Sequence, residues 1–328
     1  MEADQLSSQR FAASWPDMLK HFNPRDYVVY VGFLAILLFF TIMLWDRGFL
    51  SAANLMTIVR QSTPVTVMAI GMTFAMSAGE IDLSVGSIVA LAALVTAILL
   101  RDNSIIIAVL GGLAIGVVVG AVNGLLTVRL RIPSLLVTLG TLGVVSGLAR
   151  SITDLQAVPV QNETFNFIFG SGSIAGLSTL LIWTCVALIL GQCVLKQTVF
   201  GRHVLATGGD REAAASQGIN TDHIKVLTLV VSGTSAALAG LLYAGRLHGA
   251  RYTLGEADLL TVIAAVVIGG TSLFGGRGTV IGSVIGSLIL GMLNNGLILM
   301  GFSVSEQMIA RGIILIMAVA LSLREKRL

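Results

Sequence analysis

The sequence predicts an all-α polytopic membrane protein with about ten transmembrane helices and both termini in the cytoplasm. Hydrophobic residues make up 55% of the 328 positions and charged residues only 11%, and the mean hydropathy is +0.92. Because charged residues form roughly a quarter of an ordinary soluble domain, this composition excludes one. A span uses roughly 20 apolar residues to cross about 30 Å of hydrocarbon, so the apolar content suffices for about 8 to 11 spans.

Apolar runs bounded by charged residues, glycine or proline define ten predicted spans. In chain order they cover residues 27–46, 62–79, 83–100, 104–128, 133–149, 176–195, 226–246, 257–273, 279–300 and 305–323. They form a transmembrane domain over residues 27–323, between predicted cytoplasmic tails at residues 1–26 and 324–328. The longest predicted connections are an external loop at residues 150–175 and a cytoplasmic loop at residues 196–225.

The positions of Lys and Arg predict the orientation, because cytoplasmic loops are enriched in basic residues. With the N-terminus inside, 13 of the 20 basic residues fall on the cytoplasmic side and five fall outside. The cytoplasmic residues are Arg10, Lys20, Arg25, Arg129, Arg131, Lys196, Arg202, Arg211, Lys225, Arg277, Arg324, Lys326 and Arg327. The net charge of +3 is therefore explained by membrane orientation and not by binding to nucleic acid.

The cytoplasmic loop contains a short predicted helix with clear end signals. Asp210 can accept the free N–H groups of the first turn, Glu212 favours the positive end of the helix dipole, and Gly218 suits a left-handed cap. The centre of this helix contains Ala213 and Ala214. A small-residue helix between basic flanks can enter a groove on a soluble partner, although an ordinary surface connector would have the same composition.

Three segments together resemble a known family. Residues 212–218, which read Glu-Ala-Ala, three residues and Gly, are similar to the coupling segment of the permease subunits of bacterial ABC importers, without its Ile-x-Leu-Pro end. Residues 79–87 resemble the Gly-Ile-Asp-Leu-Ser-Val-Gly signature of monosaccharide permeases of the ribose/xylose class. Residues 269–278 resemble a glycine-rich segment that this group shares with branched-chain amino acid permeases. The resemblance covers roughly residues 27–323.

The resemblance implies the pore-forming permease subunit of an ATP-driven monosaccharide importer in the bacterial inner membrane. Its partners would be an ABC ATPase subunit, a periplasmic or extracellular sugar-binding protein, membrane lipid, and a second permease copy in a homodimer or heterodimer. ATP and Mg would be bound by the ATPase, and this chain would hold no cofactor. The residues expected to couple to the ATPase are Asp210, Glu212, Ala213, Ala214 and Gly218.

Two carboxylates, Glu80 and Asp82, interrupt the second and third apolar runs. An ionised group in a membrane costs several kcal/mol unless it is paired or hydrated, so both lie either at the membrane surface or at a functional position. Asp82, followed by Ser84, can cap the next helix. The alternative is that this turn lines the translocation path or braces its gate.

A glycine-rich segment precedes the ninth predicted span. Gly270 and Gly275 have the four-residue gap of a P-loop, but Gly276 and Arg277 stand where Lys and Ser/Thr should follow. We therefore expect a tight turn between closely packed helices, because glycine permits positive φ and close approach. The glycines of this turn are Gly269, Gly270, Gly275, Gly276 and Gly278.

Polar residues inside the predicted spans are further path candidates, notably Asn123, Asn294 and Asn295, although such residues more often bond a neighbouring helix. Aromatic residues are only 6% of the chain, which leaves recognition of the sugar largely to a partner. No Walker A, HExxH or GxSxG motif occurs, and the histidines lack metal-ligand spacing, so we expect neither an enzyme nor a metal site. A nucleoside or branched-chain amino acid permease and an ion-coupled secondary transporter remain the alternatives.

Overall fold

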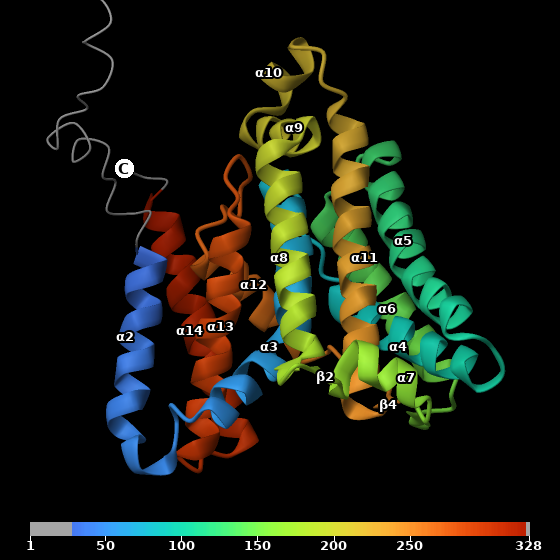
Figure 1. Ribbon diagram of the computed structural model, residues 1–328. Coiled ribbons are helices and arrows are strands. Elements are labelled where there is room, and N and C mark those ends of the chain that lie inside the picture. Colours follow the sequence, from blue (N-terminus) through green and yellow to red (C-terminus); the bar gives the residue numbers. More distant parts are fainter. Residues whose placement is uncertain (1–27, 326–328) are drawn as a thin grey trace, which may run out of the picture.

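The computed structural model describes residues 28–325, which form a bundle of helices with four very short strands (Figure 1). The predicted tail at residues 1–26 lies outside the described residues, as do residues 326–328 of the C-terminal tail. The long helices are α2 (Val28–Met43), α3 (Ala52–Ser77), α4 (Val85–Asp102), α5 (Ile105–Arg129), α6 (Ser134–Ser151), α8 (Thr179–Gln197), α11 (Thr221–Leu247), α13 (Val280–Leu299) and α14 (Val304–Glu325).

Shorter elements connect these helices. The helical ones are η2 (Trp45–Arg47), α7 (Glu163–Asn166), η3 (Phe167–Ser171), α9 (Val199–Gly209), α10 (Arg211–Ser216) and α12 (Asp258–Ile268). The strands are β1 (Val158–Pro159), β2 (Ser173–Ile174), β3 (Leu177–Ser178) and β4 (Gly249–Ala250). β1 pairs antiparallel with β4, and β2 pairs antiparallel with β3.

Six helices in the described part of the chain are long and apolar enough to cross a membrane: α4, α5, α6, α8, α11 and α13. Residues Val29–Met43 of α2 and all of α12 are apolar but shorter. The predicted class, a helical membrane protein, is therefore confirmed.

Three helix boundaries differ clearly from the sequence prediction. α3 begins at Ala52, ten residues before the predicted span, because the Ser51 hydroxyl accepts a hydrogen bond from the Asn54 N–H at 3.2 Å and starts the helix there. α11 begins at Thr221 instead of residue 226, capped by the side chain of Asn220. α12 ends at Ile268 instead of residue 273 because glycines follow it directly.

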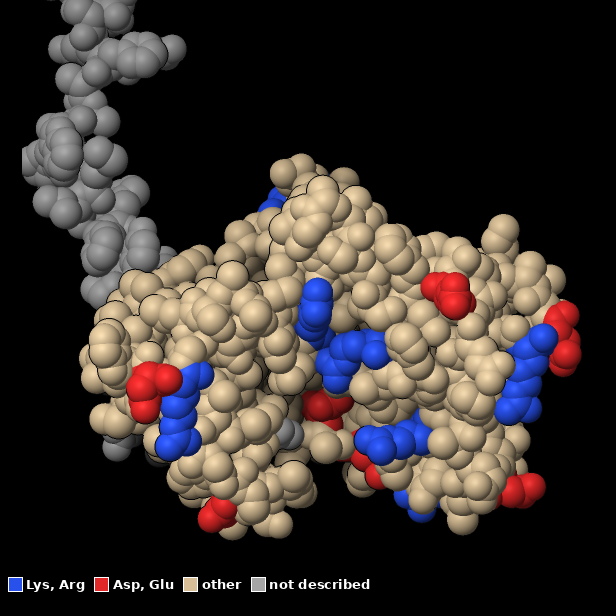
Figure 2. Space-filling model, turned by 60° about the horizontal axis from the view of Figure 1, so that its bottom comes forward, with Lys and Arg blue, Asp and Glu red and all other residues tan. Residues whose placement is uncertain are grey.

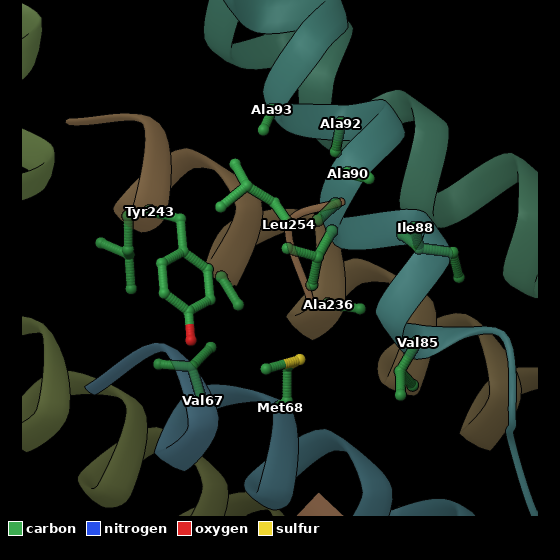
Figure 3. Close-up of a cluster of buried hydrophobic side chains, with 14 of the residues drawn as sticks. Val67, Met68, Val85, Ile88, Ala90, Ala92, Ala93, Ala236, Tyr243 and Leu254 are labelled. Atoms are coloured by element: carbon green, nitrogen blue, oxygen red, sulfur yellow. The ribbon is translucent and has the colours of Figure 1, made fainter. Parts of the chain in front are cut away.

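The centre of the bundle is α11, which packs against α3, α4 and α5. Figure 3 shows side chains of the largest buried cluster, among them Met68 on α3, Ile88 on α4 and Ala236 on α11. All three are fully buried. Alanine is frequent in this cluster, so the backbones lie close together, as expected where packing and not water drives helix association.

Glycines on α5 bring its backbone against α11. Gly112, Gly116, Gly120 and Gly124 recur every fourth residue and therefore share one face of the helix. A Cβ atom added to Gly120 would lie 2.5 Å from the carbonyl oxygen of Leu229, and one added to Gly124 would lie 2.7 Å from the Cα of Val226. The contact between α5 and α11 therefore requires glycine.

The two longest predicted loops lie at opposite ends of the bundle (Figure 1). The loop at residues 196–225 contains α9 and α10, and the loop at residues 150–175 contains β1, α7, η3 and β2. The first described residues of α2 and the last of α14 point toward the α10 end (Figure 1). We call the other end of the molecule the β4 end.

Candidate functional site

The α10 helix is short, firmly capped and mostly exposed. The Asp210 carboxylate accepts a hydrogen bond from the Ala213 N–H at 2.9 Å. Gly218 has φ of +83°, and the Ile219 N–H then bonds the Ala214 carbonyl at 3.2 Å, a left-handed cap. Ala214 faces inward and is 5% exposed, whereas Glu212, Ala213 and Gly218 are exposed. The helix thus presents Ala213 but not Ala214 to the surroundings.

The glycine-rich turn between α12 and α13 lies directly beneath α9. Gly275 and Gly276 have positive φ values of +86° and +77°, and the Gly276 N–H donates to the carbonyl of Ser77 at 3.0 Å. A Cβ atom on Gly208, in α9, would overlap that same carbonyl. The α9–α10 segment, the end of α3 and this turn are therefore in direct backbone contact.

The other glycines of the turn act at its two ends. Gly269 follows α12, and a Cβ atom on it would lie 2.5 Å from the backbone nitrogen of Ser283 in α13. Gly270 has φ of +87°. Gly278 lies against the side chain of Ser77, so that a Cβ there would overlap the hydroxyl. Close approach or positive φ accounts for each of the five glycines named from the sequence.

Glu80 forms a buried ion pair with Lys225 at 2.5 Å. Glu80 belongs to the turn after α3, and Lys225 lies in the first helical turns of α11, shortly after α10. Only 4% of the Glu80 side chain is exposed, so loss of either partner would leave a charge without compensation. The pair connects the end of α3 to the part of α11 nearest α10.

Asp82, Ser84 and Asn123 form one buried polar cluster. One Asp82 carboxylate oxygen accepts from both the N–H of Ser84 at 3.0 Å and its hydroxyl at 2.6 Å. The Asn123 amide of α5 donates to the Ser84 hydroxyl at 2.9 Å. All three side chains have 0% exposure. Asp82 therefore lies inside the protein, where it also organises the start of α4.

This cluster has capacity for more hydrogen bonds. The second Asp82 oxygen, Oδ2, and the Asn123 oxygen, Oδ1, have no partner among the described residues. Ser232, on α11, lies beside the Asp82 carboxyl and is fully buried as well. The sequence pointed to Asp82 and Asn123 but not to Ser232, because a serine in an apolar run is usually only a helix-packing residue.

Asn294 and Asn295 face different surroundings. Asn295 and Asn54 of α3 exchange two amide hydrogen bonds, both at 3.0 Å, so this asparagine joins α13 to α3. Asn294 points instead to a cavity of about 280 Å³ between α3, α11, α12 and α13. Of the two adjacent amides predicted as path candidates, one lines a cavity and the other does not.

The cavity is lined largely by polar side chains. Its polar residues are Gln61, Ser62, Tyr243, Arg246, Asp258, Thr261, Ser287 and Asn294. Arg246 lies in the last turn of α11 and Asp258 in the first turn of α12, near the β4 end. Figure 2 shows that face of the molecule, where basic and acidic side chains gather around a hollow.

A proline in α3 fixes one wall of the cavity. Pro64 has no N–H, so the carbonyl of Arg60, four residues earlier, loses its helical partner. The Arg246 guanidinium donates to that carbonyl at 3.0 Å and lies over the Tyr243 ring at 5.3 Å. The Tyr243 hydroxyl in turn donates to Asp258 at 2.6 Å.

Apart from Asn294, sequence reasoning did not name the polar residues of this cavity as candidates. Arg246 was one of the five basic residues that the sequence places outside, and Tyr243 was not singled out. The available signal was Pro64 inside an apolar helix, because a helix-interior proline leaves a carbonyl that another group must satisfy.

Comparison with known proteins identifies relatives over nearly the whole chain. The chain is 35% identical over 323 residues to the ribose import permease protein RbsC of Bacillus subtilis, covering 98% of each protein. It is 36% identical over 276 residues to the Escherichia coli K12 protein of the same name, covering 83% of this chain and 86% of that one. The chain is 36% identical over 285 residues to the L-arabinose ABC transporter permease protein AraH of Azospirillum brasilense, covering 87% of this chain and 84% of that protein. No solved structure matches the chain significantly.

The family comparison agrees with these relatives. Residues 54–319 match the family described as "Branched-chain amino acid transport system / permease component". This match covers the helices from α3 to most of α14, and with them α10, the Asp82 cluster and the polar cavity. The chain therefore belongs to this family of transport-system permease components.

Proposed function

We propose that the chain is the pore-forming permease subunit of an ATP-driven importer that carries a monosaccharide across the cytoplasmic membrane. The observation that carries this proposal is the 35% identity to a ribose import permease over 98% of both chains. The family description mentions branched-chain amino acids, but the relatives compared above are named for ribose and L-arabinose. An ion-coupled carrier is disfavoured, because one relative is named an ABC transporter permease protein and the buried carboxylate of Glu80 is paired with Lys225.

The proposed topology has ten spans and places the α10 end in the cytoplasm. In the part of the chain that the structure describes, a helix lies within each predicted span, which supports this number. The opposite positions of α10 and the β4 end support an outward loop at residues 150–175 and an inward loop at residues 196–225 (Figure 1). The excess of Lys and Arg in the proposed cytoplasmic segments supports the same direction.

In this proposal, α10 is the contact with the ATPase. Two permease chains, identical or similar, stand above two ATPase domains, and a sugar-binding protein docks at the β4 end. ATP and Mg remain with the ATPase. Closure of the ATPases moves α10, and the movement reaches the span bundle through two contacts, Gly208 against Ser77 and Gly276 and Lys225 paired with Glu80. The result is alternating access by rocking of packed helices.

Reconstitution tests the proposed function directly. The permease, its ATPase and its binding protein are placed in proteoliposomes, and uptake of labelled D-ribose, L-arabinose and L-leucine is measured with and without ATP. We expect ATP-dependent uptake of a pentose and none of leucine. Leucine uptake would assign the amino acid branch of the family, and pentose uptake driven by an ion gradient without ATP would establish a secondary transporter.

A further inference from the structure

The cavity near the β4 end contains hydroxyl groups without partners. Ser62 is only 4% exposed, and neither its hydroxyl oxygen nor that of Thr261 has a hydrogen-bond partner among the described residues. Both residues line the cavity, from α3 and α12. A buried hydroxyl without a partner costs free energy, and more so where no bulk water is present. These groups therefore favour a ligand that brings hydrogen-bonding groups of its own.

The charged groups of the cavity are held in place by contacts within the protein. Arg246 bonds the Arg60 carbonyl and covers the Tyr243 ring, and Tyr243 bonds Asp258. A guanidinium has five N–H donors, so Arg246 retains donors for a ligand beyond the one used on the carbonyl. One positive and one negative group together give the cavity no net charge. The site is thus suited to a neutral ligand that offers both donors and acceptors.

The remaining lining agrees with this chemistry. Gln61 and Asn294 each bring an amide, which can donate and accept at once. Val65, Leu290 and Ile298 provide apolar surface beside them, which suits the C–H groups of a sugar ring. The volume of about 280 Å³ is just below that of drug-sized ligand sites, which measure about 300–1,000 Å³. A single monosaccharide fits this size class.

We infer that this cavity is a sugar-contact site on the translocation path, in which Thr261, Asn294 and Arg246 hydrogen-bond hydroxyl groups of a monosaccharide released by the binding protein. The inference rests on the proposed function and adds to it a site within the permease. Selection of the sugar is then shared between the binding protein and the permease.

The test removes one hydroxyl at a time from both the protein and the sugar. Thr261→Val keeps the side-chain shape and deletes the hydroxyl, and Asn294→Ala deletes the amide. Each reconstituted importer is supplied with D-ribose or its 2-, 3- or 5-deoxy analogue on saturating binding protein, and maximal uptake rates are compared. Because the binding protein is the same throughout, its own preference cancels in the comparison between variants.

We expect each variant to slow ribose uptake by about threefold to tenfold, the effect of one neutral hydrogen bond. For at least one analogue, the ratio of the ribose rate to the deoxyribose rate should also move toward one. In that variant the protein group that binds this sugar hydroxyl is already gone, so removing the hydroxyl from the sugar has no further effect. A purely structural defect would slow all sugars equally and leave every ratio unchanged, and that result in both variants would overturn the inference.

Asn295→Ala is the matched control. It removes the same side chain from the next residue, which pairs with Asn54 and does not line the cavity. We expect it to lower thermal stability while all sugar ratios stay at the wild-type values; altered ratios would count against the site. Failure of the wild-type importer to carry any pentose would instead refute the proposed function, so the two failures are distinguishable.

Discussion

The Asp82 carboxyl group is completely enclosed by the protein, although a buried charge is costly. Its hydrogen bonds to Ser84 order the start of α4, and Asn123 extends the cluster to α5. Both interpretations of this residue, helix start and gate, thus involve the same hydrogen bonds. They differ in whether the negative charge itself is needed.

Substitution of Asp82 by asparagine separates these two roles. An asparagine oxygen can still accept from the Ser84 N–H and hydroxyl, so we expect Asp82→Asn to assemble and to unfold near the wild-type temperature. If the charge braces a gate, ATP-dependent uptake will fall at least tenfold. Size-exclusion chromatography and uptake in vesicles measure the two effects, and intact assembly together with intact uptake would remove Asp82 from the transport mechanism.

Pro64 is the second residue with a separable effect. Pro64→Ala restores an N–H that can bond the Arg60 carbonyl, so the helix should become more stable, since a proline inside a helix costs about 3 kcal/mol. Arg246 then loses its anchor. We expect an unchanged or higher melting temperature with slower sugar uptake, and faster or equal uptake would show that the position of Arg246 is unimportant.

At the scale of elements, the sequence predicted helices better than their ends. Within the described residues each apolar run contains a helix, and six of these helices are long and apolar enough to cross a membrane, because apolar composition and length are local properties. The start of α3 was placed too late because the predicted span began only after Arg60 and Gln61, whereas the helix runs through both residues from its cap at Ser51. Likewise Ala213 and Ala214 look equivalent in sequence, and packing alone distinguishes them.

The candidate site was predictable only in part for the same reason. Asp82, Ser84 and Asn123 could be named one by one, since each is polar within an apolar context, but their meeting depends on how α4 packs against α5. The polar cavity combines α3 with α11, α12 and α13, which come much later in the sequence. No local pattern marks such a combination.

The two central alanines of α10 should respond differently to substitution by arginine. Ala213→Arg changes an exposed residue, whereas Ala214→Arg forces a charge into a position that is 5% exposed. We expect the first variant to insert and fold normally but to lose binding of the ATPase and uptake. The second should reduce the amount of folded permease. Co-purification with the ATPase checks the first expectation, and normal ATPase binding by Ala213→Arg would contradict the role of α10.

The whole molecule depends on close contact between α5 and α11. Gly116→Ala would place a Cβ against the carbonyl of Gly233, and such overpacking typically costs about 1–3 kcal/mol. Gly140→Ala on α6 is the control, because no atom lies within 4 Å of its added Cβ. We expect a clearly lower melting temperature for the first variant only. Equal melting temperatures would mean that the two helices can separate without loss.

The missing helical hydrogen bond at Pro64 predicts how related sequences vary at two positions. A relative that replaces this proline with an ordinary helix former no longer needs an outside donor for the carbonyl at position 60. The arginine at position 246 is then no longer needed as the donor to that carbonyl, so this position can vary with the substrate. We therefore expect substitutions at positions 64 and 246 to occur together among relatives. A relative without the proline at position 64 is then expected to bind a different substrate in this cavity.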